Sequence, residues 1–294
     1  LLGILLMLGF CAFAPMGDAI AKLLGETLPL LTLLTARFAV QALVLAPVAW
    51  RGLAAFPRRL LRLVAIRTAL HILGVGCFFS ALRYLPLADA VAIAFVMPFI
   101  MLLLGKYFLG EEVGPRRLVA CAVGFGGTMM VVQPSFAEVG WPALLPLAVA
   151  LIFSLFMMMT RSIAKEVDAV ALQLVSGLMA TPALVALWLL FGGLSFDLAF
   201  VMPDGREAAL LLATALVGTF AHLLMTWSLR FAPSATLAPM QYLEIPFATF
   251  FGWLIFGDLP DGLAALGILV TVAAGLTVIA LERRAARLAA PPAV

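Results

Sequence analysis

Three side chains that can titrate or bind a charged group lie inside long apolar stretches of this sequence. His71 and His222 are the only two histidines among the 294 residues, and Glu244 stands two positions before Pro246. An imidazole can bond a carboxylate or an amine, and it changes charge near neutral pH. A carboxylate can carry a proton or hold an ammonium group. We therefore expect these three side chains to bind a charged group or to transfer protons. The structural alternatives are a histidine bonded to a backbone carbonyl and a carboxylate paired with an arginine.

Arg37 and Asp18 are further charges in apolar surroundings. We interpret Arg37 as structural, a cation that neutralises Glu244 or Asp18, with binding of a substrate carboxylate as the alternative. Asp18 lies nearer the end of its apolar stretch, where a helix cap or contact with water is the simplest interpretation.

The composition indicates that the solvent of this chain is a lipid bilayer. Hydrophobic residues make up 65% and charged residues 11% of the sequence, and the mean hydropathy is +1.18. A soluble domain carries about 25% charged residues. The three cysteines share no short spacing, so we expect neither a disulfide framework nor a metal site. The phosphate-binding sequence G-x-x-x-x-G-K-[ST] is absent, so we do not expect ATP to be the energy source of this protein.

Two stretches of the chain repeat one another. The motif L-R-Y-L-P at 82–86 returns as L-R-F-A-P at 229–233, M-P-F at 97–99 returns as I-P-F at 245–247, and L-G-E at 109–111 returns as F-G-D at 256–258. A repeat of this kind indicates two related halves. Pro98 and Pro246 hold equivalent positions near the middle of apolar segments, where a proline leaves the carbonyl four residues back without its donor.

The apolar segments predict an all-α integral membrane protein with ten transmembrane helices. A membrane helix needs about 20 mainly apolar residues. Turn residues and charges place the spans at 1–23, 30–50, 63–85, 87–109, 117–134, 142–163, 169–191, 208–231, 235–256 and 262–281. We expect a first five-helix repeat at 1–134, a linker at 135–141, a second repeat at 142–281 and a cytoplasmic tail at 282–294. The run G-F-G-G at 124–127, with Gly267 and Gly275, favours close helix packing.

The positive charges predict the orientation. With the N-terminus in the cytoplasm, 14 of the 18 Lys and Arg residues lie on the inner side, Lys22, Arg83 and Arg206 lie on the outer side, and Arg37 lies within a span. Both termini are then cytoplasmic. Because each half has an odd number of spans, the second half is inverted relative to the first, an architecture that recurs in secondary transporters.

This pattern resembles the EamA family of the drug/metabolite transporter superfamily, and within it the YddG-like exporters of aromatic amino acids in bacteria. The resemblance rests on the paired motifs and central prolines and covers essentially the whole chain. It implies a multi-pass protein of the bacterial inner membrane that exports amino acids or similar small metabolites by alternating access. The central cavity would then be walled by the spans 1–23, 63–85, 87–109, 142–163, 208–231 and 235–256.

Aromatic and methionine side chains gather near the two prolines and suit a pocket that accepts varied apolar groups. Helix packing or lipid contact is the alternative for each one. The residues that we expect to bind substrate are His71, Phe78, Phe79, Phe95, Met97, Pro98, Phe153, Met157, Trp227, Met240, Tyr242 and Glu244. Pro98 and Pro246 are the expected gating positions, and Glu244, His71 and His222 are the candidates for proton coupling.

Two other functions remain open alternatives. The first is an uncoupled facilitator or channel, which would have the same membrane spans. The second is an intramembrane enzyme, for which the chain has few candidate catalytic groups, since G-x-S-x-G and H-E-x-x-H are both absent. We expect no enzymatic activity and no cofactor. The expected partners are a small-molecule substrate and the lipid bilayer, with no nucleic acid, and the expected oligomeric state is a monomer.

Overall fold

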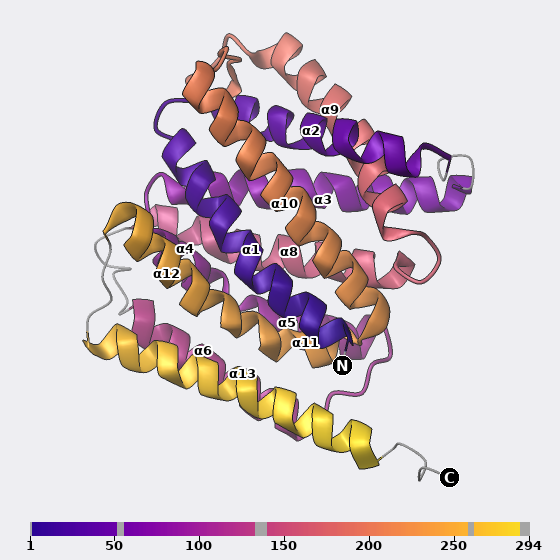
Figure 1. Ribbon diagram of the computed structural model, residues 1–294, viewed down its shortest axis with the longest axis vertical. Helices are drawn as coiled ribbons and strands as arrows, with labels where there is room; N and C mark the ends of the chain where they lie inside the picture. Colours follow the sequence, from indigo (N-terminus) through magenta and orange to yellow (C-terminus); the bar gives the residue numbers. More distant parts are fainter. Residues whose placement is uncertain (1, 52–55, 133–139, 258–261, 289–294) are drawn as a thin grey trace.

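Helices are the only regular secondary structure in residues 2–51, 56–132, 140–257 and 262–288, the parts of the chain that the computed structural model describes (Figure 1). The α-helices are α1 (Leu2–Leu24), α2 (Leu30–Ala49), α3 (Arg58–Leu82), α4 (Leu87–Ala94), α5 (Met97–Phe108), α6 (Pro115–Val132), α8 (Leu144–Ile163), α9 (Ala169–Phe191), α10 (Gly205–Phe231), α11 (Ser234–Leu237), α12 (Glu244–Phe256) and α13 (Gly262–Leu288). Short 3-10 helices are η2 (Trp141–Ala143), η3 (Phe196–Leu198) and η4 (Ala238–Leu243). The expected all-α class is confirmed.

Six of these helices are long and apolar enough to cross a membrane: α1, α2, α3, α8, α9 and α10. Their outer surfaces are apolar too, since Leu43, Val48 and Leu190 are 73%, 74% and 73% exposed. Exposed aliphatic side chains at this density are unfavourable in water and suit contact with lipid. The helices therefore have the character of membrane spans.

Local sequence signals account for several helix starts. Asp168 caps α9 by accepting from the backbone N–H groups of Val170 and Ala171. Asp204 and Glu207 form a reciprocal capping box at α10, which therefore begins at Gly205, three residues before the predicted start. The helix α3 also begins before its predicted start at residue 63, directly after Pro57. Proline is well tolerated at a helix start because the first N–H groups have no helical partner.

The predicted spans 87–109 and 235–256 lie within one residue of the observed bounds, but neither is a single helix with a proline kink. The first is divided into α4 and α5, and the second into α11, η4 and α12. Pro98 is the second residue of α5, and Pro246 is the third residue of α12. In a first helical turn the missing proline N–H leaves no hydrogen bond unmade. The two prolines therefore begin new helices and do not kink one long helix.

The predicted C-terminal boundary also differs. The last helix does not end at residue 281 but continues to Leu288, so the expected tail at 282–294 begins as helix. The residues from 282 to 288 are all Ala, Arg, Glu or Leu, which are strong helix formers. Residues 289–294 of that tail, residues 135–139 of the expected linker, and Asp258 of the second F-G-D motif lie outside the described residues.

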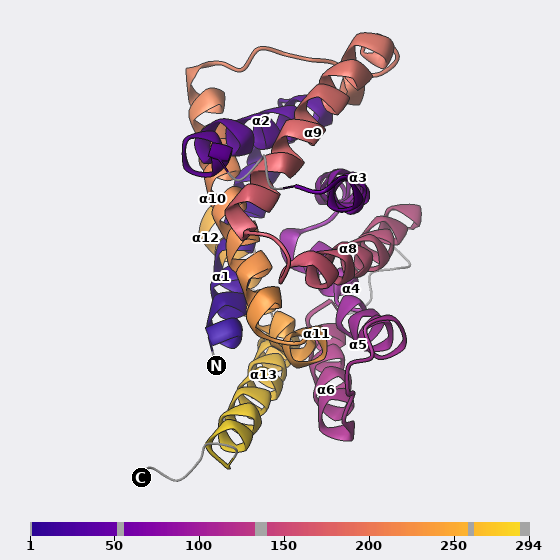
Figure 2. The ribbon, with the colours of Figure 1, turned by 90° about the vertical axis from the view of Figure 1, so that its right-hand side faces the viewer.

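The principal helix contacts all join residues before 133 to residues after 143. The helix α1 packs along α10, α2 along α9, α3 along α8, and α6 along α13. Figure 1 shows α6 and α13 together at the lower edge, and Figure 2 shows α3, α8, α4 and α5 on one side of the molecule with α1, α10 and α12 on the other. The two parts of the chain are thus interleaved, and the core lies between these two groups of helices.

The α6–α13 contact is close because both helices are glycine-rich there. A Cβ placed on Gly127 would lie 2.8 Å from the backbone oxygen of Gly267. A Cβ placed on Gly275 would lie 2.7 Å from the Leu243 side chain, so the last helix is also tightly seated on η4. These distances confirm the close packing expected from the small residues.

Two opposite faces of the helix bundle can be defined from contacts between helix ends. The N-terminal face holds the start of α1, the end of α8, the start of α9 and the end of α10. Here the Ser228 hydroxyl of α10 donates to the Gly3 carbonyl of α1 at 2.7 Å. The opposite face holds the end of α1 and the start of α4, where Lys22 Nζ donates to the Leu85 carbonyl at 3.1 Å.

Candidate functional site

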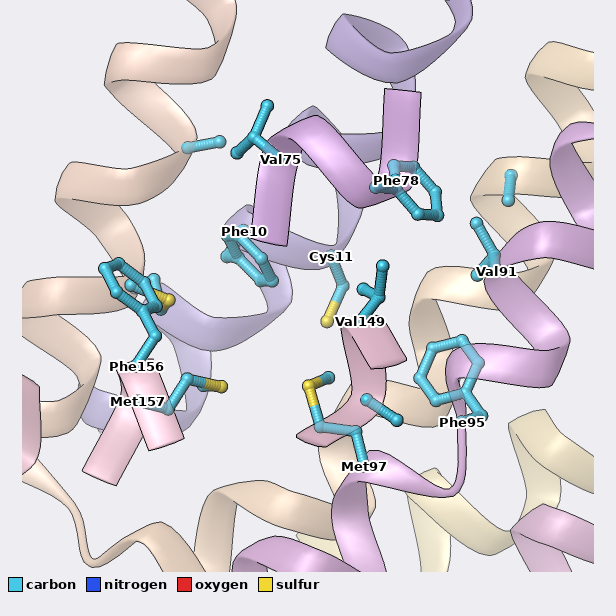
Figure 3. Packing of buried hydrophobic residues seen from close by; sticks show 14 of the residues in the cluster. Phe10, Cys11, Val75, Phe78, Val91, Phe95, Met97, Val149, Phe156 and Met157 are labelled. Carbon is cyan, nitrogen blue, oxygen red and sulfur yellow. The ribbon is translucent and has the colours of Figure 1, made fainter. Parts of the chain in front are cut away.

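A cavity lies between the middle of the bundle and the opposite face. Water can occupy about 70 Å³ of it. Its wall is mainly aromatic and aliphatic, and Figure 3 shows side chains of α1, α3, α8 and the break between α4 and α5 converging on this region. The lining residues are Phe10, Ala14, Asp18, Arg37, Val75, Phe78, Phe79, Val91, Ala94, Phe95, Met97, Val149, Phe153, Gly218, Ala221, His222 and Glu244.

Three charged side chains from three helices line this apolar cavity. Asp18 comes from α1, Arg37 from α2 and Glu244 from the first turn of α12. Arg37 and Asp18 line the same cavity, and the Arg37 guanidinium lies 5.9 Å from the Phe79 ring centroid. Asp18 faces the cavity, although the sequence favoured a helix cap or contact with water. One cation and two acids that line the same cavity can bind a group carrying both charges.

Glycine at position 218 provides the space that Arg37 occupies. A Cβ placed on Gly218 would lie 2.7 Å from Arg37 Nη1 and 2.9 Å from Nη2. Real Cβ atoms do not approach other heavy atoms so closely, so any larger residue in α10 would displace the guanidinium. The position of this charge in the cavity is therefore set by the absence of a side chain on a neighbouring helix.

The two histidines meet at the inner end of the cavity. His71 Nε2 and His222 Nε2 lie 3.3 Å apart, so one nitrogen donates and the other accepts. Aromatic rings surround the pair, with Phe38 at 5.0 Å and Phe156 at 4.7 Å from the His71 ring. The Nδ1 atoms of both rings are buried without a hydrogen-bond partner. The pair can therefore share one proton, and within the described residues neither ring forms an ion pair with a carboxylate that would stabilise a second.

A polar layer continues from the histidines toward the N-terminal face. Gln41 Nε2 donates to the Gln173 carbonyl at 2.7 Å, and Gln173 Nε2 donates to the His222 carbonyl at 3.1 Å and to Thr226 Oγ1 at 3.2 Å. These bonds join α2, α9 and α10. Buried amides satisfied in this way hold the helices in register.

The N-terminal face is closed by a network centred on Glu111, which follows α5. Its Oε1 accepts from Arg161 Nε and from the Ser234 N–H, both at 3.2 Å. Its Oε2 accepts from Ser234 Oγ at 2.6 Å and from the Ala235 N–H at 3.0 Å. The carboxylate thus joins the end of α8 to the start of α11. The L-G-E motif pointed to this position but not to its partners.

The cavity brings together six of the expected binding residues: Phe78, Phe79, Phe95, Met97, Phe153 and Glu244. His222, a candidate for proton coupling, also lines it. His71 reaches the cavity only through His222. The Tyr242 hydroxyl donates to the Phe95 carbonyl, and its ring packs on Gly124.

The other expected binding residues do not line the cavity in this structure. Met157 and Met240 are buried, and Pro98 is buried in the first turn of α5. Trp227 packs with a separate apolar cluster around Leu45 and Leu174. An apolar membrane helix carries no pattern that separates these positions from the cavity wall, because core and lipid select the same side chains.

Residues 1–133 and 140–280 match the model of the EamA-like transporter family. A riboflavin transporter of Rhizobium johnstonii is 32% identical over 227 residues, which are 75% of this chain and 71% of that protein. The pseudopaline exporter CntI of Pseudomonas aeruginosa is 28% identical over 259 residues, 87% of this chain and 88% of the exporter. An S-adenosylmethionine uptake transporter of Rickettsia prowazekii is 22% identical over 287 residues, 94% of each chain.

The crystal structure of another protein has the same fold, with a TM-score of 0.74. It is 20% identical in sequence, and the match covers 96% of this chain and 97% of that one.

Proposed function

Because the chain belongs to the EamA-like transporter family, we propose that it is a secondary transporter of the bacterial inner membrane that exports amino acids, aromatic and other neutral ones, by alternating access. The relatives transport small metabolites of several kinds, so the family supports transport more strongly than it supports one cargo. The choice of cargo rests on the chemistry of the cavity.

The observation that carries the choice is one cation and two carboxyl groups in an aromatic wall. The carboxylate of an amino acid would bind the Arg37 guanidinium, and its ammonium group would lie against Asp18 or Glu244. The ring of Phe79 and the neighbouring Phe78 would contact the side chain of the cargo. Ion pairs of this kind are strong where water is scarce.

Alternating access is supported by the interleaving of the two parts of the chain. Each principal helix contact crosses from one part to the other, and the family match falls into two segments of similar length. We infer two inverted five-helix repeats, with the N-terminal face in the cytoplasm and the protein acting as a monomer. Pro98 and Pro246 begin α5 and α12 next to the cavity, and those helix starts are the proposed gating positions.

Proton coupling would involve Glu244, His71 and His222. The histidine pair joins α3 to α10, so a change of its protonation would act on two helices that the transport cycle must move. Neutralising Glu244 (Glu244→Gln) should reduce transport while the protein still folds. Flux that stays constant from about pH 6 to 8, the range in which an ordinary histidine titrates, would exclude this coupling in favour of uncoupled exchange.

A flavin is the second candidate cargo, favoured by the riboflavin transporter that is 32% identical to this chain. The ring system of riboflavin would stack on the aromatic wall. It is uncharged at neutral pH, however, and leaves Arg37, Asp18 and Glu244 without a role.

Counterflow into proteoliposomes tests the proposal. Vesicles that contain the purified protein are loaded with unlabelled phenylalanine, leucine, riboflavin or S-adenosylmethionine, and entry of radiolabelled phenylalanine is followed. We expect saturable counterflow with phenylalanine and leucine that Glu244→Gln reduces and that the exposed control Glu112→Gln leaves unchanged. No entry of labelled phenylalanine, together with saturable entry of radiolabelled riboflavin into riboflavin-loaded vesicles, would replace the amino acid by a flavin. Flux that never saturates would replace the carrier by a channel.

A further inference from the structure

Arg67 is a fully buried arginine outside the cavity. It lies in α3, one helical turn before His71, in the half of the bundle nearer the N-terminal face, and its exposed fraction is 0%. Its Nε donates to Thr160 Oγ1 at 2.7 Å, and its Nη1 donates to Ser176 Oγ at 2.9 Å. The guanidinium lies 4.5 Å from the Phe156 ring centroid. Its contacts are therefore two hydroxyl groups and one aromatic face.

This guanidinium is incompletely satisfied. Nη2 is buried without a hydrogen-bond partner, and no carboxylate in the described part of the chain lies within ion-pair distance of Arg67. Burying an arginine in an apolar interior without an anion is energetically unfavourable, because the charge loses its hydration. Most buried arginines are therefore paired with an acid. Hydroxyl groups accept hydrogen bonds from a cation but do not neutralise it. An anion with at least one free oxygen would neutralise the guanidinium and accept from Nη2.

The partners of Arg67 all come from the later part of the chain. Thr160 and Phe156 belong to α8, and Ser176 belongs to α9, whereas Arg67 belongs to α3. Any movement that opens the N-terminal face by separating α3 from α8 and α9 breaks both hydroxyl bonds together. The guanidinium would then face the newly opened space with its donors free.

Arg37 and Arg67 lie on opposite sides of the histidine pair. Arg37 lines the cavity toward the opposite face, and Arg67 is sealed on the side of the N-terminal face. We propose that Arg67 is a second anion site, which binds a carboxylate of the cargo when the N-terminal face is open. Arg37 binds the same group when the opposite face is open. This inference rests on the proposed transport function and adds a site to it.

The first test uses the wild-type protein and does not depend on the identity of the cargo. Purified protein is treated with phenylglyoxal, which modifies accessible guanidinium groups, and the modified arginines are identified by mass spectrometry. We expect slow modification of Arg67 that benzoate suppresses and benzamide, its uncharged analogue, does not. Arg62, an exposed arginine of the same helix, is the internal control and should react quickly with either compound. Absence of modification at Arg67, or equal modification with both compounds, would overturn the proposal.

The second test measures each side of the membrane separately. Half-saturating phenylalanine concentrations are determined in right-side-out and inside-out vesicles. Arg67→Met should raise the value at the N-terminal face by about ten-fold or more, the usual worth of a charge-assisted contact, and leave the other side within about two-fold. Arg67→Lys should restore part of the loss, and Arg62→Met should change neither side. An equal change on both sides would assign Arg67 a purely structural role.

The two tests separate this inference from the proposed function. If wild-type vesicles show no saturable flux of phenylalanine but benzoate still protects Arg67, the anion site is supported and the proposed amino-acid transport is rejected. If phenylalanine is transported but the effect of Arg67→Met is not confined to one side, transport is supported and the anion site is rejected. The modification experiment needs no variant, so it decides the question even if Arg67→Met does not fold.

Discussion

His71 and His222, the only histidines of the chain, lie 3.3 Å apart through their Nε2 atoms although 151 positions separate them in the sequence. One comes from α3 and the other from α10, so the contact joins the two parts of the chain at the middle of the bundle. Each ring leaves its Nδ1 buried without a partner. The pair is therefore both a link between helices and a polar group that its apolar surroundings do not otherwise stabilise.

Replacing either histidine should lower the free energy of unfolding, and the effects of the two replacements should not be additive. We expect His71→Gln and His222→Gln each to lower the free energy of unfolding by about 1–3 kcal/mol, because each leaves one buried nitrogen unsatisfied or poorly placed. The double variant should lose less than the sum of the two, since the second change removes a group that has already lost its partner. Thermal unfolding of all four proteins in one detergent measures the cycle, and strictly additive losses would show that the contact contributes nothing.

Gly218→Ala should impair transport more than it impairs folding. The new Cβ would lie 2.7 Å from Arg37 Nη1, and the end of a flexible side chain can move away at little cost. We expect a shift of the guanidinium and a reduction of phenylalanine counterflow by about ten-fold, the worth of a displaced charged contact. Gly76→Ala, which meets only Leu34 at 3.6 Å, is the control. Equal flux in the two variants would contradict a role for the position of Arg37.

Glu111 predicts how stability depends on pH. Burial raises the pKa of this carboxyl group, but the hydrogen bonds from Ser234 and Ala235 and the charge of Arg161 lower it by more, so the net pKa is lowered. Because its pKa is lower in the folded state, the Glu111 carboxylate stabilises the protein fully above the unfolded-state pKa of about 4.3. This stabilisation is lost as the pH falls through the pKa of the folded state.

Glu111→Gln should therefore destabilise the protein at neutral pH by about 1.5–3 kcal/mol, the worth of hydrogen bonds to a charged group. The difference from wild type should shrink as the pH falls below about 4, where the wild-type carboxylate also becomes neutral. Melting temperatures of the two proteins across this range test the prediction. The exposed neighbour Glu112→Gln should change stability little at any pH, and a constant Glu111→Gln difference would contradict the electrostatic account.

The contact between α6 and α13 provides a matched pair of glycines. Gly127→Ala would place a Cβ 2.8 Å from the backbone oxygen of Gly267, which cannot move without moving the helix. We expect a loss of about 1–3 kcal/mol, as for other overpacked contacts. Gly126→Ala meets nothing within 4 Å and should leave stability unchanged or raise it slightly through helix propensity. Comparable melting temperatures for the two variants would contradict the close approach of these helices.

Much of the fold follows from the sequence because its signals are local. An 11% content of charged residues excludes water as the surrounding solvent, and long apolar segments between turn residues become helices, as α9 shows by occupying the predicted range. The break at Pro98 was harder to predict. Whether a proline kinks a long helix or begins a new one depends on the neighbours that satisfy the backbone on either side, and those are tertiary contacts.

The site depended on information that no local pattern contains. The types of its groups could be predicted from the residues alone: two histidines, a glutamate, an arginine and a wall of aromatic residues in apolar segments. Which of them meet depends on how the helices pack. The tertiary structure joined His71 to His222, placed Arg37 against Gly218, and left Trp227 in a separate cluster. In a soluble helix the polar face would have indicated the inner surface, but in a membrane both surfaces are apolar, so helix orientation is set by packing between helices.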